Sequence, residues 1–249
     1  MNKIAHILKI IAFFAFISTN VNLRAQVYAY TDMSVFAERR AMLMEQIVDG
    51  IAVFVSSPVY MRNGDVSHNH RQHSDFYYLT GFEEPRSAFI LDPNGKNKFI
   101  MFVQPKNPAI EIWTGKRTGV EGALTLYNAD NAYFISSLDS ILNIYIENAY
   151  KIYYAKSYDK DFIDKLQNKL SSFKEEKVLA DPSEIIHEMR LFKSGDEINL
   201  LKKAIDITCN AIIEVMKSAK PGMYEYELQA VLEYNFMKNG SQRIGFPSV

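Results

Sequence analysis

The chain has 249 residues, of which 48 % are hydrophobic and 13 % are aromatic, and this content favours buried cores over intrinsic disorder. Its 28 basic and 29 acidic residues give a net charge of −1, so the chain has no basic excess with which to bind nucleic acid. The length accommodates one large domain or two ordinary ones.

Residues 1–25 have the layout of an export signal. Lys3 and Lys9 form a basic start, an apolar run covers 10–17, and Leu23-Arg24-Ala25 resembles a cleavage site. The apolar run is shorter than the about 20 residues that cross a bilayer. We therefore expect cleavage after Ala25, no stable membrane anchor, and a product that is periplasmic or secreted. A retained N-terminal anchor is the alternative.

The region between residues 34 and 180 alternates helical and strand patterns, which is typical of a layered α/β domain. Short apolar runs predict strands at 51–55, 87–91, 98–103, 151–155 and 178–180. Amphipathic stripes predict helices at 34–49, 137–147 and 161–170. The second and third strands flank the turn sequence Asp92-Pro93-Asn94-Gly95, so they are expected to form a hairpin. Gly50 is expected to stop the first helix and Ser137 to cap the second.

The tail of the chain is predicted to be helical. Asp181-Pro182-Ser183-Glu184 and Ser194-Gly195-Asp196-Glu197 both have the composition of a helix start. A long amphipathic helix follows, and a second one runs from about Tyr224 to Lys238 and is closed by Asn239-Gly240. The apolar faces of these helices need partners. We therefore expect a C-terminally truncated fragment, with a genuine short protein as the alternative.

A polar segment that becomes aromatic lies between Arg62 and Pro85. It contains three histidines, two arginines and two aspartates, and it predicts a loop that leads into a buried element. An arginine beside a buried carboxylate can form a charge-assisted fork. Arg71, Asp75 and the run Phe76-Tyr77-Tyr78 are therefore expected to hold the domain together and not to catalyse.

This segment closely resembles the signature of the N-terminal domain of aminopeptidase P, in the pita-bread metallopeptidase class. The matching residues are Arg62, Asp65, Arg71, Gln72, Ser74-Asp75-Phe76, Thr80-Gly81-Phe82, Glu84-Pro85, Glu111-Ile112-Trp113, the run 187–194 and the run 220–226. They occur in the family's order over roughly 33–249. The resemblance implies a mixed sheet flanked by helices of the creatinase-like type over 26–175. An interdomain linker helix is implied at 176–193, and the first helices of an α+β pita-bread domain at 194–249.

The same resemblance implies the activity of an Xaa-Pro aminopeptidase, a metal-dependent exopeptidase that removes the residue before proline. Its members act as dimers or tetramers on peptides with proline in second position. The imide bond before proline lacks an N–H, so ordinary peptidases handle it poorly. Family members hold two divalent ions, manganese-like, with Asp, His and Glu ligands that lie beyond the position of Val249. We therefore expect no metal ligand, no catalytic residue and no hydrolysis from this chain alone.

Two substrate contacts are also implied by the resemblance. In tetrameric members the N-terminal domain of one subunit is expected to lean over a neighbour's active site, and the matching residues here are Asp65 and Trp113. A carboxylate could meet the ammonium group of the substrate, and an indole face can pack on a peptide. The alternative is that Trp113 is a core or interface aromatic and that Asp65 is a solvated loop charge.

Three other patterns suggest chemistry but are given structural interpretations. His68, His70 and His73 could meet a metal ion, yet the family pattern requires histidine at none of these positions. His187-Glu188 begins the motif H-E-x-x-H but has Leu191 in fifth place, so it is expected to belong to a linker helix. In that helix Arg190 and Glu188 are expected to pair locally. Cys209, the only cysteine, lies in the apolar register of its helix and is expected to be buried.

Two alternative functions remain open. A prolidase shares the architecture but prefers dipeptides, whereas the segment 62–85 and the linker 187–194 favour aminopeptidase P. A non-catalytic binding module of the same architecture, as in histone-chaperone relatives, is the second alternative. The export signal and the acidic composition argue against a nuclear partner.

Overall fold

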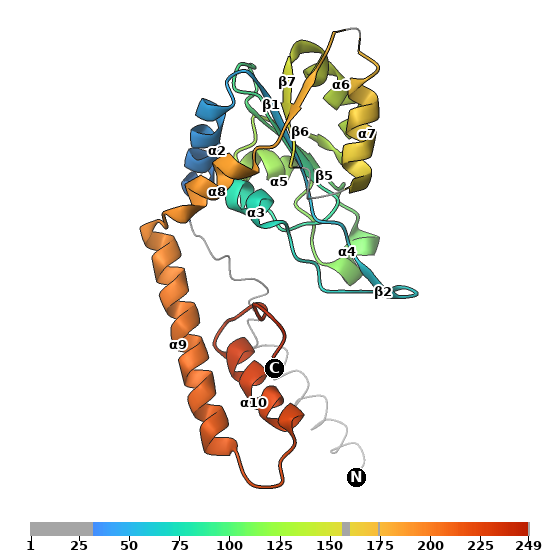
Figure 1. Ribbon diagram of the computed structural model, residues 1–249. Helices are drawn as coiled ribbons and strands as arrows, with labels where there is room; N and C mark the ends of the chain where they lie inside the picture. Colours follow the sequence, from blue (N-terminus) through green and yellow to red (C-terminus); the bar gives the residue numbers. More distant parts are fainter. Residues whose placement is uncertain (1–31, 156–159, 174, 249) are drawn as a thin grey trace, which may run out of the picture. The chain divides into compact units, whose positions relative to one another are not determined.

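The computed structural model describes residues 32–155, 160–173 and 175–248, and the predicted export signal lies outside these residues (Figure 1). The chain divides between Ser194 and Gly195 into two compact units. The first is the unit Tyr30–Ser194, and the described part of the second covers 195–248. Each unit is described by itself.

The first unit is built on a six-stranded mixed sheet with the strand order β6-β5-β4-β1-β7-β8. Its strands are β1 (Gly50–Val55), β4 (Ala88–Leu91), β5 (Phe99–Val103), β6 (Asn131–Phe134), β7 (Lys151–Tyr153) and β8 (Val178–Ala180). The pairs β1–β4 and β4–β5 are antiparallel, and β1–β7, β7–β8 and β5–β6 are parallel. This arrangement confirms the predicted mixed α/β fold.

Strand β1 lies in the middle of the sheet because both of its faces are apolar. All six of its residues are buried. Ala52 and Phe54 pack into one core cluster, while Ile51, Val53 and Val55 pack into the other. The uninterrupted apolar run in the sequence therefore corresponds to a strand covered on two sides.

Helices cover both faces of the sheet (Figure 1). The helices α2 (Ser34–Gln46), α3 (Ser74–Thr80), α5 (Gly119–Thr125) and α8 (Ser183–Leu191) contribute to the cluster around Phe54. The helices α6 (Leu138–Asn148) and α7 (Lys160–Leu170) contribute to the cluster around Val53. The predicted stripe of α2 is correct, because Phe36, Leu43 and Ile47 are all buried.

The predicted hairpin is confirmed as β4–β5. The Asp92 side chain organises its turn, because Oδ1 accepts hydrogen bonds from the backbone N–H groups of Asn94 (3.2 Å) and Gly95 (2.9 Å). The backbone N–H of Asp92 also donates to the Lys98 carbonyl at 2.9 Å. An aspartate that bonds the backbone two and three residues later is a common turn-forming device.

Gly50 and Ser137 do not have the roles that were predicted for them at helix ends. Helix α2 ends at Gln46, and Gly50 is the first residue of β1 instead of a helix stop. A Cβ at position 50 would lie 2.1 Å from the Lys151 carbonyl oxygen, so glycine is required there by the close approach of β7. Ser137 directly precedes α6, but it ends the one-turn helix η1 (Ile135–Ser137), and its side chain makes no capping hydrogen bond.

Several short elements were not predicted. They are β2 (Met61–Asn63), β3 (Val66–Ser67), α4 (Pro108–Thr114), α5 and β6. Strands β2 and β3 form a separate two-stranded ribbon. None of the residues of β2, β3 or α4 is buried, so none of these elements produces an apolar pattern in the sequence.

The second unit contains α9 (Gly195–Ser218) and α10 (Glu225–Lys238), which pack against each other. The predicted closure of α10 is confirmed: Gly240 has a φ of +92°, and Ser241 N–H donates to the Phe236 carbonyl at 3.0 Å. Cys209 is exposed on α9, so its predicted burial is wrong. Among the described residues no helix is both long and apolar enough to cross a membrane.

Candidate functional site

Asp65 lies at the tip of the β2–β3 hairpin and is exposed. Asn63 pairs with Val66 across the ribbon, so Gly64 and Asp65 form the connecting loop. Gly64 has a φ of +53°, a conformation that carries no steric cost for glycine. The hairpin thus holds the Asp65 carboxylate in solvent, where a cationic group can approach it.

Trp113 lies on α4, and local hydrogen bonds fix where this helix begins. The Asn107 side chain accepts from Ala109 N–H (3.1 Å) and Ile110 N–H (3.3 Å), and Pro108 takes the first helical position. Glu111 Oε1 in turn accepts from Asn107 N–H at 2.8 Å. Glu111 of the Glu111-Ile112-Trp113 motif therefore stabilises the helix start.

The other two residues of that motif point away from the unit. Ile112 is 80 % exposed and Trp113 is 88 % exposed. A core role for Trp113 is therefore wrong within the described part of the chain, whereas a contact with a ligand or with another molecule is compatible with this exposure. Figure 1 draws α4 and β2 at the same end of the first unit.

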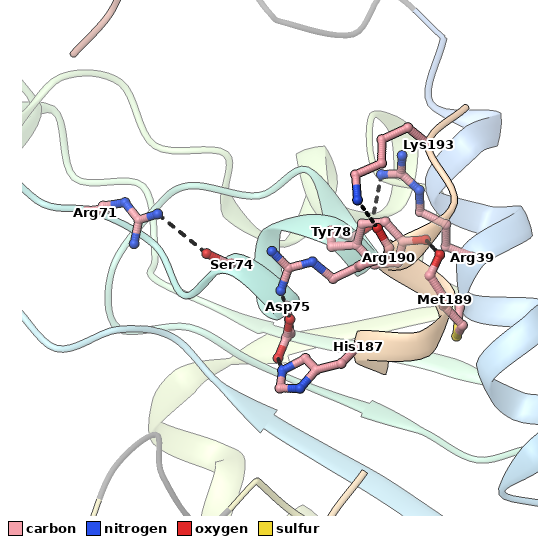
Figure 2. A network of polar contacts seen from close by, with 9 residues as sticks. All are labelled: Arg39, Arg71, Ser74, Asp75, Tyr78, His187, Met189, Arg190 and Lys193. Atoms are coloured by element: carbon pink, nitrogen blue, oxygen red, sulfur yellow. Dashed lines mark hydrogen bonds and ion pairs between the residues drawn. The ribbon is translucent and has the colours of Figure 1, made fainter. Parts of the chain in front are cut away.

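Asp75 is the buried carboxylate of the signature segment, with only 4 % of its side chain exposed. Two of its partners are on α8: Arg190 Nη1 donates to Oδ1, and His187 Nε2 lies 3.7 Å from Oδ2 (Figure 2). Two predictions are corrected here. Arg71 reaches Ser74 Oγ (3.4 Å) and not Asp75, and Arg190 pairs with Asp75 and not with Glu188.

One further hydrogen bond attaches the end of α8 to α3, and two others stabilise the C-terminus of α8 itself. The Tyr78 hydroxyl donates to the Met189 carbonyl at 3.2 Å. Lys193 Nζ donates to the carbonyls of Arg190 (2.7 Å) and Leu191 (3.0 Å), which satisfies acceptors at the helix C-terminus. His187-Glu188 thus belongs to a structural contact between α3 and α8, in agreement with the failed zinc motif.

Arg39 and Arg40 of α2 were not singled out in the sequence, yet both are buried. Arg39 Nη1 donates to the Tyr78 carbonyl (3.1 Å) and Arg40 Nη1 to the Leu79 carbonyl (2.9 Å), at the C-terminal end of α3. The Arg40 guanidinium also lies 3.8 Å from the centre of the Phe99 ring. Burial lowers the pKa of Arg40 to about 10, an effect that Asp130 opposes. The sequence does contain a signal for the burial of Arg39 and Arg40, because their helical spacing places them on the same helix face as Phe36 and Leu43.

The remaining signature residues also make structural contacts. Gln72 Oε1 accepts from Ser57 N–H (2.8 Å), and Glu84 Oε1 accepts from Thr118 N–H (2.7 Å) and Oγ1 (2.6 Å). Gly81 has a φ of +68° and packs so closely that a Cβ would lie 2.6 Å from the Phe36 ring. The signature residues therefore stabilise the part of the fold that carries the exposed β2–β3 hairpin.

The described structure does not gather His68, His70 and His73 into a cluster with other candidate metal ligands. Within the described ranges, no group of three or more His, Cys, Asp or Glu side chains is arranged so that it could hold a metal ion. Asp65 and Trp113 are accordingly the two predicted site residues whose exposed positions suit contact with a ligand.

Comparison with known proteins matches both units to families. Residues 36–153 match the family "Aminopeptidase P, N-terminal domain", and residues 199–249 match "Metallopeptidase family M24". The Xaa-Pro aminopeptidase of Escherichia coli (strain K12) is 31 % identical over 218 residues, which cover 83 % of this chain and 49 % of that protein. Xaa-Pro aminopeptidase 3 of Homo sapiens is 28 % identical over 234 residues, covering 86 % and 46 % respectively.

Solved structures give the same result. The aminopeptidase PepP of Pseudomonas aeruginosa superposes with a TM-score of 0.81 at 34 % identity, covering 86 % of this chain and 51 % of that one. Proline aminopeptidase P II from Yersinia pestis has a TM-score of 0.78 at 29 % identity, covering 84 % and 51 %. The chain thus spans about half the length of the curated relatives that it matches. It belongs to the Xaa-Pro aminopeptidase (aminopeptidase P) family of M24 metallopeptidases.

Proposed function

We propose that the full-length protein is an exported Xaa-Pro aminopeptidase, which removes the N-terminal residue of peptides with proline in second position. The observation that carries the proposal is that one chain contains both family segments in order, at 31 % identity to an Xaa-Pro aminopeptidase. Export is supported by the signal-like residues 1–25. An intact N-terminus on the mature protein would contradict export.

The family implies catalysis by divalent metal ions, which activate water for attack on the peptide carbonyl. The described residues do not fit such a centre, because they bring no group of carboxylates and imidazoles together. We therefore assign no metal ligand among the described residues. That the chain by itself is inactive is part of the proposal. Manganese is the ion that we propose for the full-length enzyme, since carboxylate-rich sites suit it.

The activity is tested with the purified full-length protein on an Xaa-Pro tripeptide and on the matching Xaa-Pro dipeptide. We expect cleavage of the tripeptide, loss of activity after treatment with a chelator, and recovery when Mn²⁺ is added. Preference for the dipeptide would favour a prolidase. Absence of hydrolysis with every divalent metal tested would favour the non-catalytic binding module.

We also propose that Asp65 and Trp113 contact the substrate peptide, in an oligomer where one subunit's hairpin and α4 reach a neighbour's site. The exposed carboxylate of Asp65 suits the peptide's ammonium group, and the exposed indole of Trp113 offers a flat apolar face. Replacing Trp113 by Ala in the full-length protein should lower kcat/KM for tripeptides roughly tenfold, the value of one well-packed aromatic contact.

A matched control is Tyr150→Ala, since Tyr150 is also an exposed aromatic residue and lies on the loop before β7. It should leave kcat/KM unchanged. Size-exclusion chromatography of each variant distinguishes a lost substrate contact from a lost subunit contact. Unchanged tripeptide kinetics in Trp113→Ala would contradict the assignment, while the proposed peptidase activity would still stand.

A further inference from the structure

Three Asn–Gly pairs occur in the sequence: Asn63–Gly64, Asn94–Gly95 and Asn239–Gly240. Asparagine before glycine can lose ammonia without any enzyme. The glycine backbone nitrogen attacks the side-chain carbonyl carbon of asparagine, and the absent Cβ leaves that approach unhindered. The reaction requires that the glycine nitrogen and the asparagine amide are both free to move, so the structure discriminates among the three pairs.

Two of the pairs are held by hydrogen bonds. Asn94 Nδ2 donates to the Val48 carbonyl (2.8 Å), and Gly95 N–H donates to Asp92 Oδ1 (2.9 Å). In the other pair, Asn239 Nδ2 donates to the Asn235 carbonyl (2.8 Å), and Gly240 N–H donates to the Met237 carbonyl (3.1 Å). Both the attacking nitrogen and the amide that it would attack are therefore restrained at these positions.

The pair Asn63–Gly64 is in a different environment. Both residues are exposed where β2 ends and the hairpin loop begins. Neither the Gly64 N–H nor the Asn63 side chain has a hydrogen-bond partner among the described residues. An added Cβ at Gly64 would meet nothing within 4 Å, so the surrounding space is open for the ring to form.

We propose that Asn63 is a site of spontaneous deamidation. The Gly64 nitrogen loses its proton to water and forms a bond to Asn63 Cγ. The Cγ–Nδ2 bond then breaks, and the side-chain nitrogen takes up a proton from water and leaves as ammonia. The resulting five-membered succinimide is then opened by one water molecule at either of its two carbonyl carbons. The products are aspartate, or isoaspartate with one additional methylene in the main chain.

Deamidation places a second carboxylate two residues before Asp65. When the product is isoaspartate, it also lengthens the backbone at the end of β2. If Asp65 contacts the substrate, deamidation of Asn63 in this hairpin alters peptide turnover. This consequence depends on the proposed function, whereas the modification itself does not.

The experiment follows the three asparagines in the full-length protein during incubation at mildly alkaline pH. Peptide mapping by mass spectrometry gives each rate, and an isoaspartyl methyltransferase labels the isoaspartate product. Each hydrogen bond that must open slows the reaction by roughly fivefold, so Asn63 should react at least about tenfold faster than Asn94 and Asn239. In denaturant the three rates should converge. Equal rates in the folded protein would overturn the proposal.

Two variants test the proposal without any comparison of rates among the three asparagines. Asn63→Gln should abolish most methyltransferase labelling, because the longer side chain must close a less favourable six-membered ring. Asn94→Gln, the matched control in another exposed turn, should leave the labelling unchanged. Persistent labelling in the Asn63→Gln protein would assign the reactive site elsewhere and refute the inference.

Discussion

Asp75 is the residue on which the contact between α3 and α8 depends. A carboxylate removed from water is costly unless charged or hydrogen-bonding partners compensate for the lost hydration. Arg190 and His187, three residues apart on α8, lie on the same helix face and both approach this carboxylate. A buried acid and its basic partners are thus brought together from two helices that are distant in the sequence.

Replacing Asp75 by Asn should lower the free energy of unfolding by about 2 kcal/mol, because the Arg190 guanidinium would lose its ionic partner at a half-buried position. Urea denaturation of the variant and of the parent protein measures the difference. The control is Arg71→Gln, which removes the exposed arginine closest in sequence. It should change stability by less than about 0.5 kcal/mol. A larger loss for Arg71→Gln than for Asp75→Asn would contradict the assigned pairing.

The sequence correctly predicts that an arginine pairs with Asp75, but Arg71 is the wrong arginine. Arg71 is the nearest candidate along the chain, whereas Arg190 is separated from Asp75 by 115 positions. Sequence proximity favours local partners, and only the packing of α8 beside α3 brings Arg190 within reach. Asp65 and Trp113, by contrast, were identified by motif, and the structure adds their exposure.

At the level of elements, the backbone of β1 depends on Gly50. Replacing Gly50 by Ala should destabilise the protein by about 3 kcal/mol, because the new Cβ meets the rigid Lys151 backbone of β7 and not a flexible side chain. The matched control is Gly195→Ala at the start of α9, where an added Cβ meets nothing within 4 Å. Thermal unfolding should show a clear loss for the first variant and little change for the second. Equal midpoints would mean that β1 and β7 separate easily at this position.

Elements with buried faces were predictable, and elements without them were not. Strand β1 and helix α2 produce strong apolar patterns because they pack into the core. Strand β6 escaped prediction because Ala132 is its only buried residue at the edge of the sheet. Helix α4 has no buried residue at all, so its only sequence signal was the capping pair Asn107-Pro108. Hydrophobic periodicity reports burial and cannot detect helices that are exposed on every side.

On the scale of the whole molecule, the two units differ in how much apolar surface they bury. The first unit covers both faces of its sheet with helices. In the described part of the second unit only Ala211 is buried, and large apolar residues of α9 are exposed, among them Leu201, Ile205 and Met216. Most helical stability in proteins comes from packing an amphipathic face, and isolated short helices are marginal in water.

We therefore predict that the two segments behave differently when each is produced alone. Residues 32–194 should unfold in one cooperative urea transition, since their sheet and both helical layers are present. Residues 195–249 should show weak helicity by circular dichroism and a gradual loss of signal, because α9 and α10 have only each other to pack against. A cooperative transition for 195–249 would contradict this prediction. It would show that the contact between these two helices is sufficient for folding, and that the exposed face of α9 does not need to be covered.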